Sequence, residues 1–483
     1  MNLRIRRIQA QWEYFQIVPT PKPTNQSGKQ GATSSEYWIK KNSYYHAQHL
    51  SFYASMIPPM KRVLHINCQS GALLDAICSS FGVGIGIGKT ENLTQIEMQS
   101  ITLAMLPTET FDYVILSFVT QQTDDAQKLL EELQRFCTPH TRVFVDTYSY
   151  VWEPLLWLSS RLGLRRTTPF KHWITTDDLD NFFYLTDFDP IRRGGFMLMP
   201  IHIPLVSWFF NHVAAQLPII NKLCLHQWVL VRLKPTKDKL AQQQPTVSVV
   251  VPCRNERGTI QALVERLPLL GASTEIIFVE GGSTDNTREE ITRVIKLFGD
   301  RTIHLLDQTG HGKGDAVRAG FEYATGQVLM ILDADLSVPP EDLPRFLNAL
   351  ISRKGELING SRLVYGMESD AMRFLNLCAN FFFAHQFSWI LGQRIKDTLC
   401  GTKVLWKHDY ETIKANQTFF GNTDPFGDFD LLFGASKIHL KIIDMPITYR
   451  RRVYGTTNIS RFRHGIILLW MSIHGMRKLK FYR

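Results

Sequence analysis

The sequence feature that most limits the possible folds of this chain is a short apolar strand that ends in two aspartates. The stretch 326–342 reads GQVLMILDADLSVPPED, in which residues 328–332 are apolar, Asp333 and Asp335 follow, and a Pro-Pro pair stops any regular continuation. Carboxylates two residues apart on extended backbone point to the same side, where their like charges repel each other. Mg²⁺ or Mn²⁺ would relieve that repulsion, because hard cations prefer oxygen ligands. A solvated turn after a strand remains the alternative on this stretch alone.

Three further motifs precede this stretch in a fixed order. They read VSVVVPCRN at 247–255, EIIFVEGGSTDNT at 275–287 and GHGKGDAVRAG at 310–320. The first two are strands that open into polar turns, and the third is a loop that enters a helix. Together with the aspartate pair, they resemble the family 2 glycosyltransferases with a GT-A fold, especially the polyprenyl-phosphate sugar synthase-like branch. The resemblance spans roughly 247–470 and implies a nucleotide-sugar-binding domain at 247–475.

Composition and charge narrow the remaining classes of protein. A chain of 483 residues suggests two or three domains. Its seven cysteines are scattered without any CxxC spacing, which argues against both a disulfide framework and a zinc site and favours a reducing, cytoplasmic compartment. The basic N-terminus lacks the apolar core of a signal peptide, and no window reaches the apolar length of a spanning helix. The net charge of +10 fits anionic ligands, an anionic membrane surface or simply a basic surface. No nucleic-acid-binding motif is present.

The first half of the chain alternates strands with helices. After a polar tail at 1–35, the sequence RVLHINCQSGALLDAIC from Arg62 onward predicts a strand, a turn and a helix. Apolar runs at 82–88, 111–118 and 141–147 predict three further strands, and a helical pattern lies between the last two. This order predicts a doubly wound parallel sheet. Over about 37–232 it resembles the class I S-adenosylmethionine-dependent methyltransferases, which implies a Rossmann-type domain at 36–233. The polar, proline-containing stretch 234–246 is typical of a linker.

The cofactor-binding positions of that methyltransferase-like half depart from the family pattern. The first loop carries His65, Asn67 and Gln69 where the family has an acidic residue and glycines, and only Gly71 is kept. Gly86 stands where an acidic residue would hold the ribose, and Thr102 lies in the region of the acidic residue near the adenine. Backbone without glycine cannot approach a cofactor as closely, and the ribose loses its charged partner. We expect a degenerate domain that does not bind S-adenosylmethionine. A bifunctional enzyme that also methylates is the alternative.

The resemblance to family 2 glycosyltransferases implies a part for individual residues in the second half. Sugar transfer requires that the protein hold the nucleoside, neutralise the diphosphate and place the acceptor in line. A metal bound by Asp333 and Asp335 would stabilise the departing diphosphate. The residues implied in binding a UDP- or GDP-linked donor are Pro252, Asn255, Glu256, Glu280, Ser283, Asp285, Lys313, Asp333, Arg362 and Arg452. For Arg362, a surface ion pair is the alternative interpretation.

Three further aspartates are implied in catalysis by the same resemblance. Asp397 lies in KDTLCGTK, and Asp428 and Asp430 flank Phe429. Either Asp428 or Asp430 is a candidate base if the acceptor is a hydroxyl, and Asp430 could instead cap the helix 431–437. A lipid phosphate acceptor is already anionic and needs no base. The basic loop YRRRVYGTTN at 449–458, in which Asn458 replaces the family's lysine, could close over the donor diphosphate.

Two apolar segments of the second half bear on membrane contact. The run 373–392 is apolar on more than one helix face, so burial in the core is the first interpretation, and an interfacial helix is the alternative. The end of the chain, MRKLKFYR at 476–483, adds basic and aromatic groups. We therefore expect an inverting, metal-dependent glycosyltransferase, cytoplasmic or peripheral at the inner face of the membrane, with a polyprenyl phosphate as the favoured acceptor. A non-catalytic two-domain scaffold is the hypothesis from another class.

Overall fold

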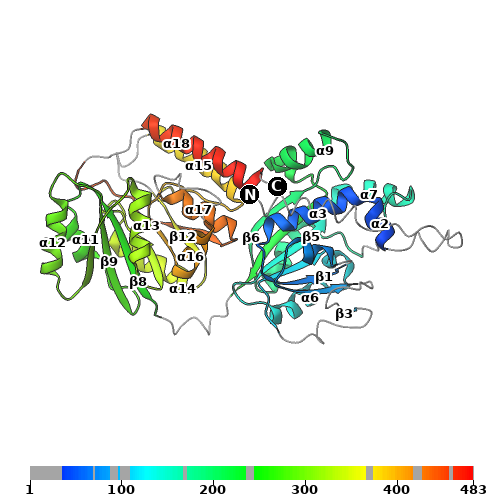
Figure 1. The fold of residues 1–483 in the computed structure, drawn as a ribbon, viewed down its shortest axis with the longest axis horizontal. Coiled ribbons are helices and arrows are strands. Elements are labelled where there is room, and N and C mark those ends of the chain that lie inside the picture. The colour runs from blue at the N-terminus through cyan, green and yellow to red at the C-terminus, as the bar shows by residue number, and fades with distance from the viewer. Residues whose placement is uncertain are drawn as a thin grey trace. The chain divides into compact units, whose positions relative to one another are not determined.

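The structure, a computed structural model, describes residues 35–68, 71–86, 96–97, 109–166, 171–234, 244–365, 374–416, 427–455 and 461–481. The chain divides into two compact units, Met1–Lys234 together with Arg483, and Pro235–Tyr482. Each unit is an α/β body with its own sheet (Figure 1). The predicted tail up to residue 34, most of the predicted linker, and Gln69, Thr102 and Asn458 lie outside the described residues.

The N-terminal unit is built on a seven-stranded mixed sheet of order β3-β2-β1-β4-β5-β7-β6. The strands from β3 to β5 pair in parallel, whereas β7 runs antiparallel to both β5 and β6. The expectation of a purely parallel sheet is therefore wrong at this edge, because β6 and β7 pair with each other as antiparallel neighbours. The strands are β1 (Arg62–Ile66), β2 (Phe81–Gly86), β3 (Ile96–Glu97), β4 (Tyr113–Ser117), β5 (Arg142–Tyr148), β6 (Phe188–Phe196) and β7 (His226–Leu233).

Helices cover both faces of this sheet. Leu130 of α6 and Phe183 of α8 pack on one face, and Phe52 of α3 and Leu74 of α4 pack on the other. All residues of β4 are buried, as expected of a central strand covered on both sides. The helices are α2 (Ser35–Lys41), α3 (Ser43–Met56), α4 (Ala72–Ala76), α5 (Val119–Gln122), α6 (Ala126–Leu133), α7 (Glu153–Arg161), α8 (Thr176–Leu185), α9 (Val206–Trp208) and α10 (Pro218–Asn221).

The C-terminal unit also has a seven-stranded mixed sheet, of order β10-β9-β8-β11-β13-β12-β14. The strands β10, β9, β8 and β11 pair in parallel, so their carboxyl ends meet at one edge. Beyond them, β13 runs antiparallel to β11 and to β12. The strands are β8 (Thr246–Cys253), β9 (Ser273–Glu280), β10 (Thr302–Asp307), β11 (Val328–Ile331), β12 (Leu357–Ser361), β13 (Lys403–Trp406) and β14 (Ile442–Pro446).

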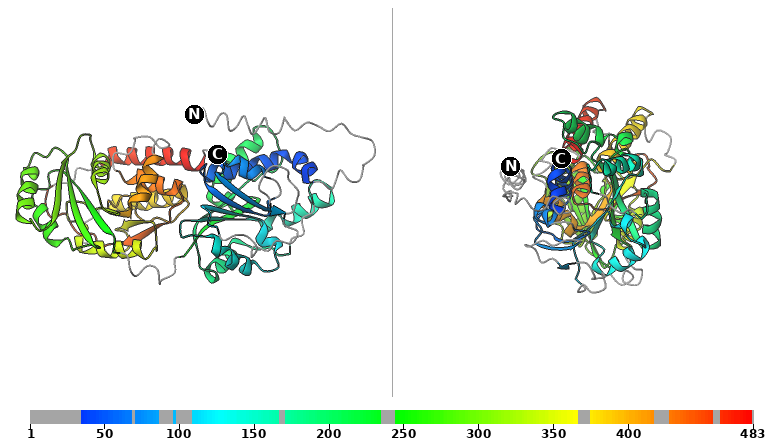
Figure 2. Two further views of the ribbon diagram at one scale, coloured as in Figure 1. Left: turned by 60° about the horizontal axis from the view of Figure 1, so that its bottom comes forward. Right: turned by 90° about the vertical axis from the view of Figure 1, so that its right-hand side faces the viewer.

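Two buried clusters sandwich this second sheet. One face packs against α11, α12 and α14, and the other against α13, α15, α16, α17 and α18. Helix α18 lies beside α15 (Figure 1 and Figure 2). The helices are α11 (Ile260–Arg266), α12 (Thr287–Leu297), α13 (Lys313–Tyr323), α14 (Leu343–Ile351), α15 (Phe374–Leu391), α16 (Lys407–Ala415), α17 (Asp428–Lys437) and α18 (Arg461–Gly475).

The apolar segment 373–392 contains α15, whose side chains from residue 379 onward are buried on one face of the helix. Phe387, Ile390 and Leu391 lie in the core, as the core interpretation predicts, whereas Phe381 and Phe382 are about half exposed. Of the helices in the described part of the chain, none combines the length and apolarity that a membrane crossing needs.

Candidate functional site

The loops that follow β8 and β9 are joined by hydrogen bonds from the predicted donor-binding residues. Pro252 lies within β8 and pairs with Val279 of β9. The backbone N of Asn255 donates to Ser283 Oγ (2.9 Å), and Asn255 Oδ1 accepts from the backbone N of Thr284 (2.8 Å). The structure thus brings the first two predicted motifs together at the carboxyl edge of the sheet.

Two acidic residues fix the shape of the second loop. The carboxylate of Glu280 accepts from the backbone N of Gly282 (3.1 Å) and of Ser283 (2.6 Å). Asp285 accepts from the backbone N of Arg257 (3.2 Å), which belongs to the loop after β8. These bonds hold the loop in one shape in the absence of a ligand.

Arg452, from the predicted basic loop, bridges two acidic residues of the site. Its Nη1 lies 3.0 Å from Glu256 Oε1, and its Nη2 lies 3.0 Å from Asp335 Oδ2. Burial raises the pKa of Glu256 to about 7 against the opposing attraction of Arg452, with Asp335 among the carboxylates that add to the rise. The loop therefore lies against the first motif and the aspartate pair at once.

Asp333 is paired with Lys313, which begins α13. Burial by itself would lower the pKa of the ammonium, but the attraction of Asp333 and Asp428 keeps that pKa above its ordinary value. Burial would raise the pKa of Asp333, and Lys313 nevertheless holds it below the ordinary value. Gly401 packs directly on this pair, since a Cβ there would overlap Lys313 Nζ and Asp333 Oδ2.

The aspartate pair stands in a turn rather than on a strand. The strand β11 ends at Ile331, two residues before Asp333, so the expectation that extended backbone aligns the two carboxylates is wrong. Each carboxylate is instead partly exposed and held by a different cation, Asp333 by Lys313 and Asp335 by Arg452. Both carboxylates are partly exposed, and carboxylate oxygens are the ligands that Mg²⁺ and Mn²⁺ prefer.

Asp397, a predicted catalytic residue, holds Arg362. Its carboxylate accepts from Arg362 Nε (2.7 Å), Nη2 (2.8 Å) and backbone N (3.0 Å), and from the backbone N of Leu399 (3.0 Å). These four donors use the lone-pair positions that a carboxylate offers. The side chains are 13% exposed for Arg362 and 0% for Asp397, so Arg362 does form an ion pair, as the alternative predicts, but a buried one and not a surface one.

The two aspartates of α17 also face cations. Asp428 Oδ1 accepts from Lys403 Nζ (2.8 Å), which also donates to the carbonyl of Cys400 (2.6 Å). Asp430 pairs with Arg318 (3.3 Å) and lines a small pocket next to the start of α13. The expectation that Asp430 caps the helix is wrong, because α17 already begins at Asp428.

Sequence reasoning missed the cations that neutralise these aspartates. Lys403 is 25 residues from Asp428, and Arg318 is 112 residues from Asp430. Lys403 is a charged residue inside an apolar strand, which is the one signal that could have marked it as a buried partner. Nothing local in the sequence marks Arg318.

The loop after β1 in the N-terminal unit is closed by internal hydrogen bonds. His65 Nε2 lies 2.9 Å from Ser117 Oγ, and Asn67 Nδ2 donates to the Ser117 carbonyl (2.7 Å). Side chains thus fill the carboxyl edge between β1 and β4, which is the switch point where Rossmann-type sheets bind their ligands.

Comparison with known proteins places a family within the C-terminal unit. Residues 248–412 match the model of a family described as Glycosyl transferase family 2. The chain is similar to undecaprenyl-phosphate 4-deoxy-4-formamido-L-arabinose transferases: 34% identical over 105 residues to that of Klebsiella pneumoniae, and 37% over 106 residues to that of Yersinia pestis. Each alignment covers 21% of this chain and 32% of the relative, so the chain spans about a third of the curated relatives it matches. The prediction of a family 2 glycosyltransferase domain is confirmed.

Solved structures give a weaker similarity. The glucosyl-3-phosphoglycerate synthase of Mycobacterium tuberculosis, solved with Mn²⁺, uridine diphosphate and glucosyl-3-phosphoglycerate, aligns at a TM-score of 0.36 and 16% identity. The alignment covers 51% of this chain and 85% of that one. At that TM-score the similarity carries no argument about the site.

Proposed function

We propose that this chain, which carries a family 2 glycosyltransferase domain in its C-terminal unit, transfers a sugar from a nucleotide-sugar donor with inversion and with a divalent metal. One observation carries the proposal. Asp333 and Asp335 lie together with Lys313 and Arg452 at the carboxyl edge of β11 and β8. That edge is where an open α/β sheet binds its ligand, and two carboxylates beside two cations suit a metal–diphosphate group.

Each member of this cluster has a part in the proposed reaction. Asp333 and Asp335 hold Mg²⁺ or Mn²⁺, which supplies charge stabilisation for the departing diphosphate. Lys313 and Arg452, which lie against these two carboxylates, would donate to phosphate oxygens of the donor. The preorganised loop 280–287 and Asn255 flank the nucleoside, and Arg362, fixed by Asp397, adds a cation at the rim of the site.

The proposed acceptor is a polyprenyl phosphate. The curated relatives are named as transferases to undecaprenyl phosphate. A phosphate acceptor needs no general base, and this agrees with the pairing of Asp397, Asp428 and Asp430 with cations. In this proposal these three aspartates position cations rather than abstract a proton.

An apolar face on the C-terminal unit supports contact with a lipid acceptor. Ile466, Leu469 and Trp470 of α18 are between 47% and 70% exposed, and the adjacent turn 476–480 carries three basic residues. Exposed aromatic and aliphatic groups next to basic ones are typical of a surface that rests on an anionic leaflet.

For the N-terminal unit we propose a methyltransferase-like domain that has lost cofactor binding. The parallel part of its sheet has the order 3-2-1-4-5 of Rossmann-type folds. The hydrogen bonds of His65 and Asn67 to Ser117 occupy the edge that a cofactor would need. Equilibrium titration with S-adenosylmethionine tests this part, and a saturable heat of binding would favour the bifunctional alternative.

A transfer assay tests the proposed activity. Full-length protein is incubated with labelled UDP- and GDP-sugars, Mn²⁺ and vesicles that contain undecaprenyl phosphate, and lipid-linked label is measured. We expect product with one donor, loss of product in EDTA and in D333N and D335N, and retention in D342N, a control that changes a nearby aspartate paired with Arg345. Full turnover in both D333N and D335N would overturn the proposal, and absence of product with every donor would favour a scaffold.

A further inference from the structure

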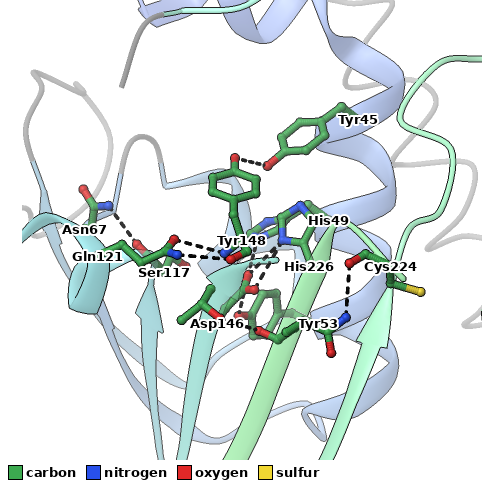
Figure 3. Close-up of polar contacts among 12 residues, drawn as sticks. Tyr45, His49, Tyr53, Asn67, Ser117, Gln121, Asp146, Tyr148, Cys224 and His226 are labelled. Atoms are coloured by element: carbon green, nitrogen blue, oxygen red, sulfur yellow. Dashed lines mark hydrogen bonds and ion pairs between the residues drawn. The ribbon is translucent and has the colours of Figure 1, made fainter. Parts of the chain in front are cut away.

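Two histidines and an aspartate converge inside the N-terminal unit, far from the proposed transferase site in sequence. His49 comes from α3, Asp146 from β5, and His226 is the first residue of β7. His49 Nε2 lies 3.2 Å from Asp146 Oδ2, and His226 Nδ1 lies 3.3 Å from each oxygen of that carboxylate. Figure 3 shows both imidazole rings turned toward the Asp146 carboxylate. Sequence analysis gave no signal for this cluster, since its members are 80 and 97 residues apart.

The spacing of the three groups fits a metal ion. The atoms that His49, Asp146 and His226 would offer as ligands all lie within 4.8 Å of one another. Zinc–ligand bonds of about 2.0–2.1 Å in a tetrahedral arrangement separate neighbouring ligand atoms by about 3.3 Å. The observed nitrogen–oxygen distances of 3.2 and 3.3 Å match that separation.

Burial makes the charge of this cluster costly without a cation. The side chains of Asp146 and His226 are 0% exposed. Buried charges in proteins are paired or coordinate metals. His49, whose side chain is 13% exposed, is the least buried of the three groups.

The surroundings resemble the enclosing shell of a metal centre. The rings of Phe196, Tyr148 and Phe118 lie 4.4, 5.1 and 5.2 Å from the His226 ring. Tyr53 donates its hydroxyl to Asp146 Oδ2 at 3.5 Å and so orients the carboxylate from a second direction. An apolar wall with one hydrogen bond to a ligand is the kind of shell that fixes metal ligands and limits the access of water.

We propose that the N-terminal unit binds one divalent first-row transition metal, of the zinc class, through His49 Nε2, His226 Nδ1 and the Asp146 carboxylate. Imidazole nitrogen selects such metals over Mg²⁺, so the site differs in preference from the all-oxygen pair of the transferase half. Three protein ligands leave one further position for water or a ligand. The metal would tie α3 to β5 and β7 across the edge of the sheet. The sequence-based argument against a zinc site rested on cysteine spacing, whereas this proposed site is made of histidine and aspartate.

Metal analysis of the full-length protein tests the proposal, with D335A as the background so that the transferase site does not contribute. Apo protein is loaded with Zn²⁺, passed over a weak chelator and analysed for metal content, and Co²⁺ loading is followed by its visible absorption. We expect about one Zn²⁺ per chain and the intense visible band of tetrahedral cobalt with nitrogen ligands.

Matched variants separate ligation from folding. H49Q removes a partly exposed ligand, and we expect its affinity for Zn²⁺ to fall at least about tenfold. H46Q changes a histidine on the same helix that is not among the three and should keep the metal. D146N should also lose the metal, and circular dichroism checks that both loss variants remain folded.

Two results would overturn the proposal. The first is metal content in the D335A background that stays near zero. The second is equal zinc affinity in folded H49Q and H46Q. Either outcome leaves the transferase proposal intact, because that proposal rests on the other unit.

Discussion

The buried pair of Arg362 and Asp397 gives a sharp prediction about stability. D397N keeps the shape of the side chain but removes its charge and one acceptor oxygen. Arg362, with a side chain 13% exposed, then has no carboxylate against its guanidinium. Breaking a buried ion pair from one side costs about 3–5 kcal/mol. We expect D397N to lower the free energy of unfolding of the C-terminal unit by that amount.

Thermal and urea unfolding of the full chain measure the effect. Each kcal/mol moves the midpoint of a unit of this size by about 2–4 °C, so the corresponding transition should fall by roughly 6–20 °C. E341Q is the control, because Glu341 pairs with Arg266 at 2.8 Å on the surface and is 52% exposed. Such a pair contributes under about 1 kcal/mol.

The same pair predicts how the effect depends on pH. Burial would raise the pKa of Asp397, but Arg362 holds it below its ordinary value of 3.8. The unfolded state therefore binds more protons than the folded state just below pH 3.8, and the stability from this carboxylate is lost as pH falls through the folded-state pKa. The gap between wild type and D397N should be full above pH 3.8 and shrink below it. A gap under 1 kcal/mol at pH 7, or one that does not change with pH, would refute the reasoning.

Three other substitutions test separate contacts of the transferase unit. G401A should lower the free energy of unfolding by about 1–3 kcal/mol, because its Cβ would overlap the Lys313 ammonium. The control G299A, with no atom within 4 Å of its Cβ, should leave thermal unfolding nearly unchanged. R452K should weaken nucleotide binding about tenfold in calorimetry, since a lysine cannot make both bonds of the guanidinium fork; an unchanged affinity would remove Arg452 from the donor site. W470S should leave stability within about 0.5 kcal/mol but reduce sedimentation with anionic vesicles, and equal sedimentation would argue against α18 as the membrane face.

Local pattern in the sequence was enough to predict most strands and the edge where the donor motifs meet. Three strand ends can be predicted from the sequence. One follows the apolar run 328–332, and the other two precede the polar turns after 247–253 and 275–280. In the parallel part of a sheet those ends share one edge, so Asn255, Ser283 and Asp335 could be grouped without a structure.

Contacts between residues far apart in the sequence could not be predicted in the same way. The antiparallel direction of β7 and of β13 depends on which strands they pair with in the sheet. Both strands have apolar patterns that suit either direction. Asp428 and Asp430 pair with cations that share no local motif with them. The same holds for His49 and His226, which lie close together in the fold. The pairing of Asp397 with Arg362 was missed for the same reason, because a family motif names a residue without showing what its carboxylate contacts.

Nucleotide titration tests the central claim most directly. Wild type, D335A and the control D342N are titrated with UDP and with GDP, each with Mn²⁺ and with EDTA, by isothermal calorimetry. The account predicts that one nucleotide binds wild type and D342N only when Mn²⁺ is present, and that D335A loses this binding. Nucleotide binding of equal strength in EDTA, or undiminished in D335A, would contradict it.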